Sequence, residues 1–176
     1  MVLGTGERIF IGLGSNLPGP HGKPQAQLEA ALVELAEAGV RTVRRSRWYE
    51  SEPVPVSDQP WFVNGVAEVE TALEPGELLA LLHRLEAAFG RIRRVRNEAR
   101  ALDLDLLAYG DRVLAGEEGP ILPHPRLQDR AFVLLPLAEI APAWRHPQLG
   151  ESATALAAKL PPGQRIRLAG PAVEVE

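Results

Sequence analysis

The chain contains no cysteine, only one methionine and only two lysines, against seventeen arginines, in 176 residues. Without cysteine it has no disulfide framework, no thiolate nucleophile and no cysteine-ligated zinc site. No apolar run approaches the ~18 residues that a membrane-spanning helix requires, and the first residues lack the apolar core of a signal peptide. These absences favour a cytoplasmic protein that has no membrane partner.

The bulk composition is that of an ordinary globular domain. Hydrophobic residues make up 45% and charged residues 24% of the chain, and this length suits one domain with a real core. We expect a single domain over residues 1–176, with its core over about 8–160 and a C-terminal tail over 161–176. The net charge of −4 and the low aromatic content of 5% argue against a nucleic-acid partner.

The hydrophobic periodicity predicts an alternation of strands and helices. Turn residues dominate residues 52–61 and 116–125, and the tail from residue 161 has no clear pattern. We expect strands over 8–13, 40–51, 62–71 and 101–109, and helices over 25–38, 75–90, 126–140 (broken at Pro136) and 152–160. The leading order predicts an α+β fold with a ferredoxin-like βαββαβ core. Its sheet would be mostly antiparallel, with helices packed on it and long mobile loops over the active site.

Two carboxylates in the last predicted strand are the strongest chemical signal in the chain. Asp103 and Asp105 alternate with leucines, so the two acidic side chains share one face of the strand and the leucines share the other. The carboxylates then stand ~7 Å apart, a separation that one or two hard cations can bridge. Magnesium prefers carboxylates that it shares with substrate phosphates. An amphipathic strand with a solvated outer face would show the same pattern.

Five arginines lie just before this strand, at Arg91, Arg93, Arg94, Arg96 and Arg100. Guanidinium groups suit phosphate oxygens because they are permanently charged and fork-shaped. Beside a metal-binding pair, such a loop can neutralise charge that develops on a transferring phosphate. A solvated charge run and a nucleic-acid-binding loop remain alternatives. No stretch matches the phosphate loop of ordinary kinases.

Further candidates lie outside the arginine-rich segment. Phe62 and Asn64 share one strand face, where a flat heterocycle could stack on the ring while its edge pairs with the amide. His83 and Glu86, three apart, share one helix face, opposite much of the leucine stripe. His124 stands between two prolines and could donate to a phosphate.

The ordered motifs of this chain resemble the 6-hydroxymethyl-7,8-dihydropterin pyrophosphokinase family over roughly residues 9–143. The motifs are Gly12-Leu13-Gly14-Ser15-Asn16, Asp58 to Asn64, His83 to Glu86, Gly90 to Arg93, Arg100 to Asp105, Pro123-His124-Pro125 and Arg130-Ala131-Phe132. The resemblance implies a ferredoxin-like core and transfer of the β,γ-pyrophosphoryl group of ATP to the pterin hydroxymethyl oxygen. AMP would be released. ATP and hydroxymethyl-dihydropterin would be the partners of a monomeric enzyme of folate biosynthesis.

The resemblance also implies roles for individual residues. Asp103 and Asp105 would bind two magnesium ions, and Arg91 and Arg100 would be catalytic arginines. ATP would contact His83, Glu86, Arg93, Leu106, His124 and Arg130, and the pterin would contact Ser51, Val54, Phe62, Asn64 and Phe132.

Two departures from the family pattern bear on these roles. The family often has Trp-Gly-Pro-Arg-Thr before the acidic strand, where this chain has the residues Asn97 to Ala101, and one residue fewer precedes Arg100. Pro125 stands where a tyrosine hydroxyl can contact phosphate. Two other activities remain open from the sequence: a magnesium-dependent phosphohydrolase that acts on a nucleotide, and a ferredoxin-like RNA-binding domain.

Overall fold

The computed structural model describes residues 6–90, 99–117 and 119–170. Within these residues six strands form one antiparallel sheet in the order β5-β1-β4-β3-β8, with β2 pairing to β4 beside this path. The strands are β1 (Ile9–Ser15), β2 (Arg41–Arg45), β3 (Tyr49–Ser51), β4 (Phe62–Glu70), β5 (Asp103–Tyr109) and β8 (Ile166–Leu168). The short strands β6 (Leu114–Ala115) and β7 (Ile121–Leu122) form a separate hairpin.

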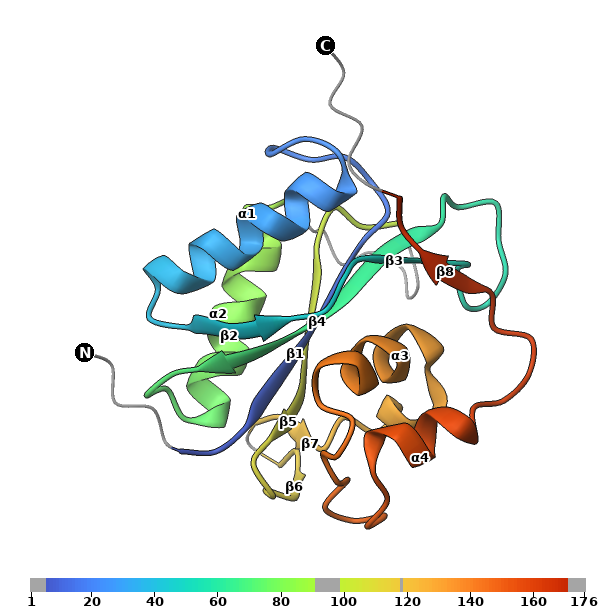
Figure 1. Cartoon of the computed structure of the whole chain (residues 1–176). Helices are drawn as coiled ribbons and strands as arrows, with labels where there is room; N and C mark the ends of the chain where they lie inside the picture. Colours follow the sequence, from blue (N-terminus) through green and yellow to red (C-terminus); the bar gives the residue numbers. More distant parts are fainter. Residues whose placement is uncertain (1–5, 91–98, 118, 171–176) are drawn as a thin grey trace.

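Helices cover both faces of the sheet. The helices are α1 (Pro24–Glu37), α2 (Pro75–Ala88), the 3-10 turn η1 (Leu127–Asp129), α3 (Ala131–Ile140) and α4 (Ala153–Ala158). Figure 1 shows α1 and α2 on one side of the sheet and α3 and α4 on the other. The expected α+β fold with an antiparallel sheet is confirmed, and the strand order reproduces the ferredoxin-like arrangement. In the part of the chain that is described, no helix is long and apolar enough to cross a membrane.

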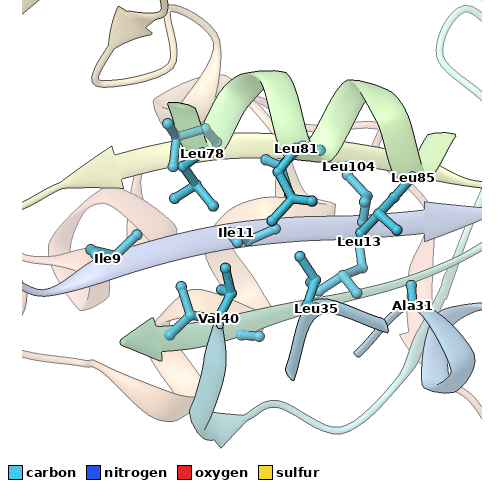
Figure 2. Packing of buried hydrophobic residues seen from close by; sticks show 14 of the residues in the cluster. Ile9, Ile11, Leu13, Ala31, Leu35, Val40, Leu78, Leu81, Leu85 and Leu104 are labelled. Atoms are coloured by element: carbon cyan, nitrogen blue, oxygen red, sulfur yellow. The ribbon is translucent and has the colours of Figure 1, made fainter. Parts of the chain in front are cut away.

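The larger core lies between the sheet and the helices α1 and α2. Leucines at helical spacing, such as Leu78, Leu82 and Leu85 of α2, face inward and are buried. They belong to the same cluster as Ile11 and Leu13 of β1, and Figure 2 shows Leu78 and Leu85 of α2 above that strand. The side of the sheet that carries the leucines of β5 is therefore fully used in packing.

The opposite face of the sheet has a second core that covers only part of its area. Phe10 and Leu107 pack there against Leu134 and Leu137 of α3 and against Leu156 of α4. The carboxyl half of β1, the start of β5 and the start of β4 extend beyond this cluster. The polar residues of the candidate site lie on that remaining area.

The strand expected over residues 40–51 is two strands in the structure. Ser46 interrupts it: its N–H donates to the Val66 carbonyl, and its hydroxyl accepts from the Val66 N–H at 3.0 Å. Trp48 then covers Gly65, where an added Cβ would lie 2.6 Å from the indole ring. The side-chain bond and the close ring contact replace regular pairing, which explains the poor alternation of the sequence.

Three other expectations need correction. Pro136 does not break its helix, because α3 runs through it and begins only at Ala131. Residues 116–125, expected to be turn and loop, contain the strand β7. The tail, which has no clear pattern in the sequence, contributes β8, which pairs with β3 through Ser51 and Ile166.

Candidate active site

A row of paired residues crosses the sheet and joins the acidic strand to the candidate ring-binding strand. Gly14 of β1 is paired with Asp103 of β5 on one side and with Asn64 of β4 on the other. Directly paired residues of antiparallel strands point to the same face, so Asp103 and Asn64 share the α3 side of the sheet. Neighbouring strands lie ~4.8 Å apart, which places these two residues about 10 Å apart at their backbones. A Cβ at Gly14 would come within 2.9 Å of Asn64 Oδ1, so glycine keeps the space between them open.

The acidic pair lies on this face as the alternation predicted. Asp105 is paired with Gly12, two residues along from the pairing of Asp103, whereas Leu104 and Leu106 are buried in the core on the other side. Burial, together with the negative charges of Asp103 and Glu86, raises the pKa of the Asp105 carboxyl to about 7, against the opposing effect of Arg130 and Arg100. Two carboxylates of like charge thus lie together in a poorly solvated position.

Arg100 is attached to this pair through both its side chain and its backbone. Its guanidinium forms an ion pair with Asp103, with 2.9 Å between Nη1 and Oδ1. Its backbone N–H donates to Asn16 Oδ1 at 2.7 Å, and its carbonyl accepts from the Asn16 N–H at 2.9 Å. The last residues before β5 are therefore fastened to the end of β1.

Arg130 connects the acidic pair with an aromatic ring. Its guanidinium carbon lies 5.4 Å from the centroid of the Phe132 ring. Burial lowers the pKa of the Arg130 guanidinium, while the Asp105 carboxylate acts in the opposite direction. A half-buried cation that faces a carboxylate and stacks on a ring is well placed to contact an anionic ligand.

His124 lies near the same charges and is neutral. Burial lowers the pKa of its imidazole to about 4, the positive charge of Arg130 lowers it too, and Asp103 opposes both. Its Nδ1 accepts from the Arg126 N–H at 3.1 Å, so the ring proton belongs on Nε2. The segment is held to β5 by the His124 N–H, which donates to the Leu107 carbonyl at 2.8 Å.

Of three further candidates, Glu86 is placed differently from what the sequence suggested, whereas His83 and Leu106 lie on the expected faces. Glu86 does not lie on an exposed helix face with His83: it is buried on the β5 side of α2 and accepts from the Leu104 N–H at 3.0 Å. His83 is exposed on α2. The Leu106 side chain lies in the core, on the face opposite the acidic pair, so only its backbone is left for a ligand.

A pocket of about 220 Å³ lies at the other end of the row. Ser51 and Val54 line it from β3 and the following loop, and Phe132 lines it from α3. Phe62 is paired with Ser51 across the two strands. Asn64 Nδ2 donates to Ser51 Oγ at 2.5 Å. Three of the five residues expected around a flat ring therefore line this pocket, and Phe62 and Asn64 are connected to it through Ser51.

Arg91 and Arg93 lie outside the described residues. Among the residues that are described, no group of three or more His, Asp or Glu could form a closed metal cage.

Two features of the site were not predicted from the sequence. Asn16 Nδ2 donates to Gln59 Oε1 and to the Pro60 carbonyl, both at 3.1 Å, so Asn16 joins the pocket loop to Arg100. The scarcity of Asn in the chain was the available signal. Gln164, which lines the pocket, lies in the C-terminal tail, where no sequence pattern marks it as a site residue.

Paired carboxylates, flanking arginines and an adjoining ring pocket are typical of an enzyme that transfers phosphoryl groups to a small cyclic acceptor. Comparison with known proteins identifies the family within this class. Residues 10–142 match the protein-family model described as 7,8-dihydro-6-hydroxymethylpterin-pyrophosphokinase (HPPK). The chain belongs to this family.

Individual relatives agree with this placement. A 2-amino-4-hydroxy-6-hydroxymethyldihydropteridine pyrophosphokinase of Synechocystis is 44% identical over 144 residues, which are 81% of this chain and 70% of the relative. The protein of the same name from Pseudomonas aeruginosa is 44% identical over 141 residues, 80% of this chain and 85% of its own length.

Solved structures show the same fold. A Plasmodium falciparum HPPK-DHPS variant crystallised with pterin and p-hydroxybenzoate superposes with a TM-score of 0.70 at 15% identity, over 89% of this chain and 44% of that chain. The chain described here spans less than half the length of that protein. At this identity the likeness concerns the fold alone.

Proposed function

We propose that the α3 side of the sheet is where this chain transfers the β,γ-pyrophosphoryl group of ATP to 6-hydroxymethyl-7,8-dihydropterin and releases AMP. The reaction follows from family membership: it is pyrophosphoryl transfer to hydroxymethyldihydropterin in folate biosynthesis. The observation that supports the location is the row Asp103–Gly14–Asn64, in which the acidic strand and the Asn64 amide share one face of the sheet. In the transfer, the hydroxymethyl oxygen bonds to the β-phosphorus. The bond between the β-phosphorus and the oxygen that it shares with the α-phosphate breaks, and AMP leaves with that oxygen.

Asp103 and Asp105 fit a site for magnesium. They offer hard oxygen donors on one face, and the charge of Asp103 raises the pKa of the Asp105 carboxyl, a repulsion that a bound cation would relieve. When bound with ATP, magnesium would neutralise phosphate charge and align the phosphates. The Arg100 ion pair partly meets this need in the present arrangement.

The ATP phosphates would lie between the acidic pair and α3. Arg130 and the Nε2–H of His124 are the donors that face this region, and a neutral imidazole can donate without adding repulsion toward the arginines. Arg100 would turn from Asp103 toward the phosphates when the metal arrives. Arg91 and Arg93 of the preceding segment would complete the set of cations, and His83 and the Leu106 backbone would meet the nucleotide.

The pterin would occupy the pocket beside Ser51 and Val54. Phe62 and Phe132 would hold the flat ring from two elements, and the Asn64 amide would pair with its polar edge. Binding energy from this remote ring would fix the hydroxymethyl oxygen in line with the phosphate. Alignment of this kind contributes much of the rate in phosphoryl transfer.

The test is an analysis of nucleotide products after the protein is mixed with ATP, magnesium and hydroxymethyl-dihydropterin. We expect AMP and a pterin diphosphate in equal amounts. ADP as the product would contradict pyrophosphoryl transfer. Phosphate released from ATP without pterin would instead indicate a phosphohydrolase.

A further inference from the structure

The pocket has an outer wall that comes from the C-terminal segment. Residues 162–166 line it, opposite the loop that follows β3 and next to the start of α3. In Figure 1 this segment leads into β8, at the sheet edge beside β3. The wall therefore adjoins both the loop after β3 and the start of α3, which would contact the pterin ring.

Gln164 fastens this wall to α3 with both ends of its amide. Its Oε1 accepts from the Ala131 N–H at 2.8 Å, and its Nε2 donates to the Asp129 carbonyl at 2.8 Å. Ala131 is the first residue of α3, and the side chain at the N-cap position, Arg130, makes no capping bond. Gln164 thus supplies from a distant segment the acceptor that the first turn of the helix lacks.

The other edge of the wall is attached to β3 and the pocket loop. The Glu52 N–H donates to the Arg165 carbonyl at 3.0 Å. The guanidiniums of Arg165 and Arg167 lie 5.3 and 4.7 Å from the ring centroid of Trp61, at the far end of the same loop. The segment consequently holds the loop at both of its ends.

We propose that Gln164 is a positioning residue for the pterin: it sets the distance between Phe132 and the pocket loop, and with it the fit of the flat ring. Phe132 is the residue after the amide that Gln164 binds, so a shift of the first turn of α3 moves the ring directly. This inference rests on the proposed function, since it takes the pocket to be the pterin site. Gln164 makes no described bond to the acidic pair, but its two bonds flank Arg130, which would contact the ATP phosphates, so ATP binding should be affected less strongly than pterin binding.

The experiment compares wild-type protein with Gln164→Ala, Gln164→Glu and the control Gln148→Ala, which removes an exposed glutamine outside the pocket. Pterin affinity is measured by calorimetry with a non-hydrolysable ATP analogue present, and ATP-analogue affinity is measured alone. We expect Gln164→Ala to raise the pterin Kd and KM about tenfold, the effect of two lost hydrogen bonds. The ATP-analogue Kd should rise less than the pterin Kd, by about threefold or less, because Arg130 lies between the two residues that Gln164 binds. Gln164→Glu keeps the acceptor for Ala131 but opposes the Asp129 carbonyl, so it should recover part of the affinity.

The possible outcomes separate the role of Gln164 from the proposed function. Unchanged pterin affinity in Gln164→Ala, with a wild-type protein that binds pterin and forms AMP, would overturn the role of Gln164 and leave the proposed function intact. Equal losses of pterin and ATP-analogue affinity would overturn it too, because they would indicate general loosening of the fold. A wild-type protein that binds no pterin would overturn both.

Discussion

Asn16 and Arg100 form two reciprocal hydrogen bonds between the end of β1 and the residue that precedes the acidic strand. The Asn16 N–H donates to the Arg100 carbonyl, and Asn16 Oδ1 accepts from the Arg100 N–H. The same side chain uses its Nδ2 to hold Gln59 and Pro60. One buried amide therefore joins the loop of the ring pocket to the segment that carries a candidate catalytic arginine.

Replacing Asn16 should test that connection. Asn16→Ala leaves the Arg100 N–H and the Pro60 carbonyl without this partner, at a cost of about 1–3 kcal/mol of unfolding free energy for each group that stays buried. We expect turnover to fall by roughly a hundredfold, because a small misplacement of reacting groups has that effect. Asn16→Asp keeps the acceptor for Arg100 and loses only the Nδ2 donor, so it should retain more activity. Steady-state kinetics at a temperature where both variants are folded would check this, and equal activity of all three proteins would contradict it.

Replacing Asp105 of the acidic pair should raise the stability of the folded protein and lower its turnover. The pKa of Asp105 is about 7 in the folded protein against an ordinary 3.8, so its charge opposes folding at pH values above 7, and this penalty disappears as pH falls toward 3.8. Asp105→Asn should therefore raise the Tm of the metal-free protein at pH 8 and leave it unchanged near pH 4. Turnover should fall ~10³-fold or more, as it should in Asp103→Ala. Thermal melts in chelator and product assays test the two halves, and near-normal turnover of either variant would refute the metal site.

Substitutions in the ring pocket should separate the two substrates. Phe62→Ala and Asn64→Ala should weaken pterin binding by about 1–3 kcal/mol, the cost of a lost stacking ring or an unpaired ligand edge. ATP-analogue affinity in the absence of pterin should stay nearly unchanged. Ser51→Ala removes the acceptor that orients the Asn64 amide, so its effect should be smaller than that of Asn64→Ala. Calorimetry showing equal losses for both ligands would place these residues outside the pterin site.

The sequence was sufficient for the features that local periodicity determines. Alternation placed Asp103 and Asp105 on one face and the leucines on the other, and helical spacing identified α1 and α2 with nearly correct bounds. The roles of Phe62, Asn64 and Phe132 at a pterin stay predictions: Phe132 lines the pocket, and Phe62 and Asn64 adjoin its Ser51.

The misplaced features depend on contacts between distant segments. The spacing of Glu86 in the sequence suggests an exposed side chain. Its carboxylate is buried instead, because it accepts a hydrogen bond from the Leu104 N–H at the start of β5. The pairing of β8 with β3 and the two bonds of Gln164 join residues more than thirty positions apart, and no local pattern encodes them. The split between β2 and β3 depends on how Trp48 packs over Gly65.

His146 should give the C-terminal part of the fold a pH-dependent stability. It is 4% exposed, burial lowers the pKa of its imidazole from the ordinary 6.5, and its Nδ1 accepts from the Leu149 N–H at 3.1 Å. Because the folded state disfavours the protonated ring, the stabilisation is complete above pH 6.5 and is lost as pH falls through the lowered pKa. His146→Gln removes the titration, so wild type should lose more unfolding free energy than this variant between pH 7 and 5. Parallel pH curves in denaturant titrations would contradict this.

The ion pair between Arg100 and Asp103 predicts opposite effects of one substitution on metal affinity and on turnover. While Arg100 Nη1 lies 2.9 Å from Asp103 Oδ1, the guanidinium competes with a cation for that carboxylate. Arg100→Ala should therefore tighten the binding of Mn²⁺ alone, measured by electron paramagnetic resonance, by a few-fold, since an exchanged carboxylate partner of this kind is worth about 1 kcal/mol. Turnover should nevertheless fall by roughly 10²–10³-fold, because the arginine would stabilise charge on the transferring phosphate. Arg100→Lys should restore little turnover, since it keeps the charge without the fork, and Arg145→Ala, an exposed arginine outside the site, should change neither quantity. Weaker Mn²⁺ binding in Arg100→Ala would show that the arginine supports the metal site, and unchanged turnover would remove Arg100 from the reaction.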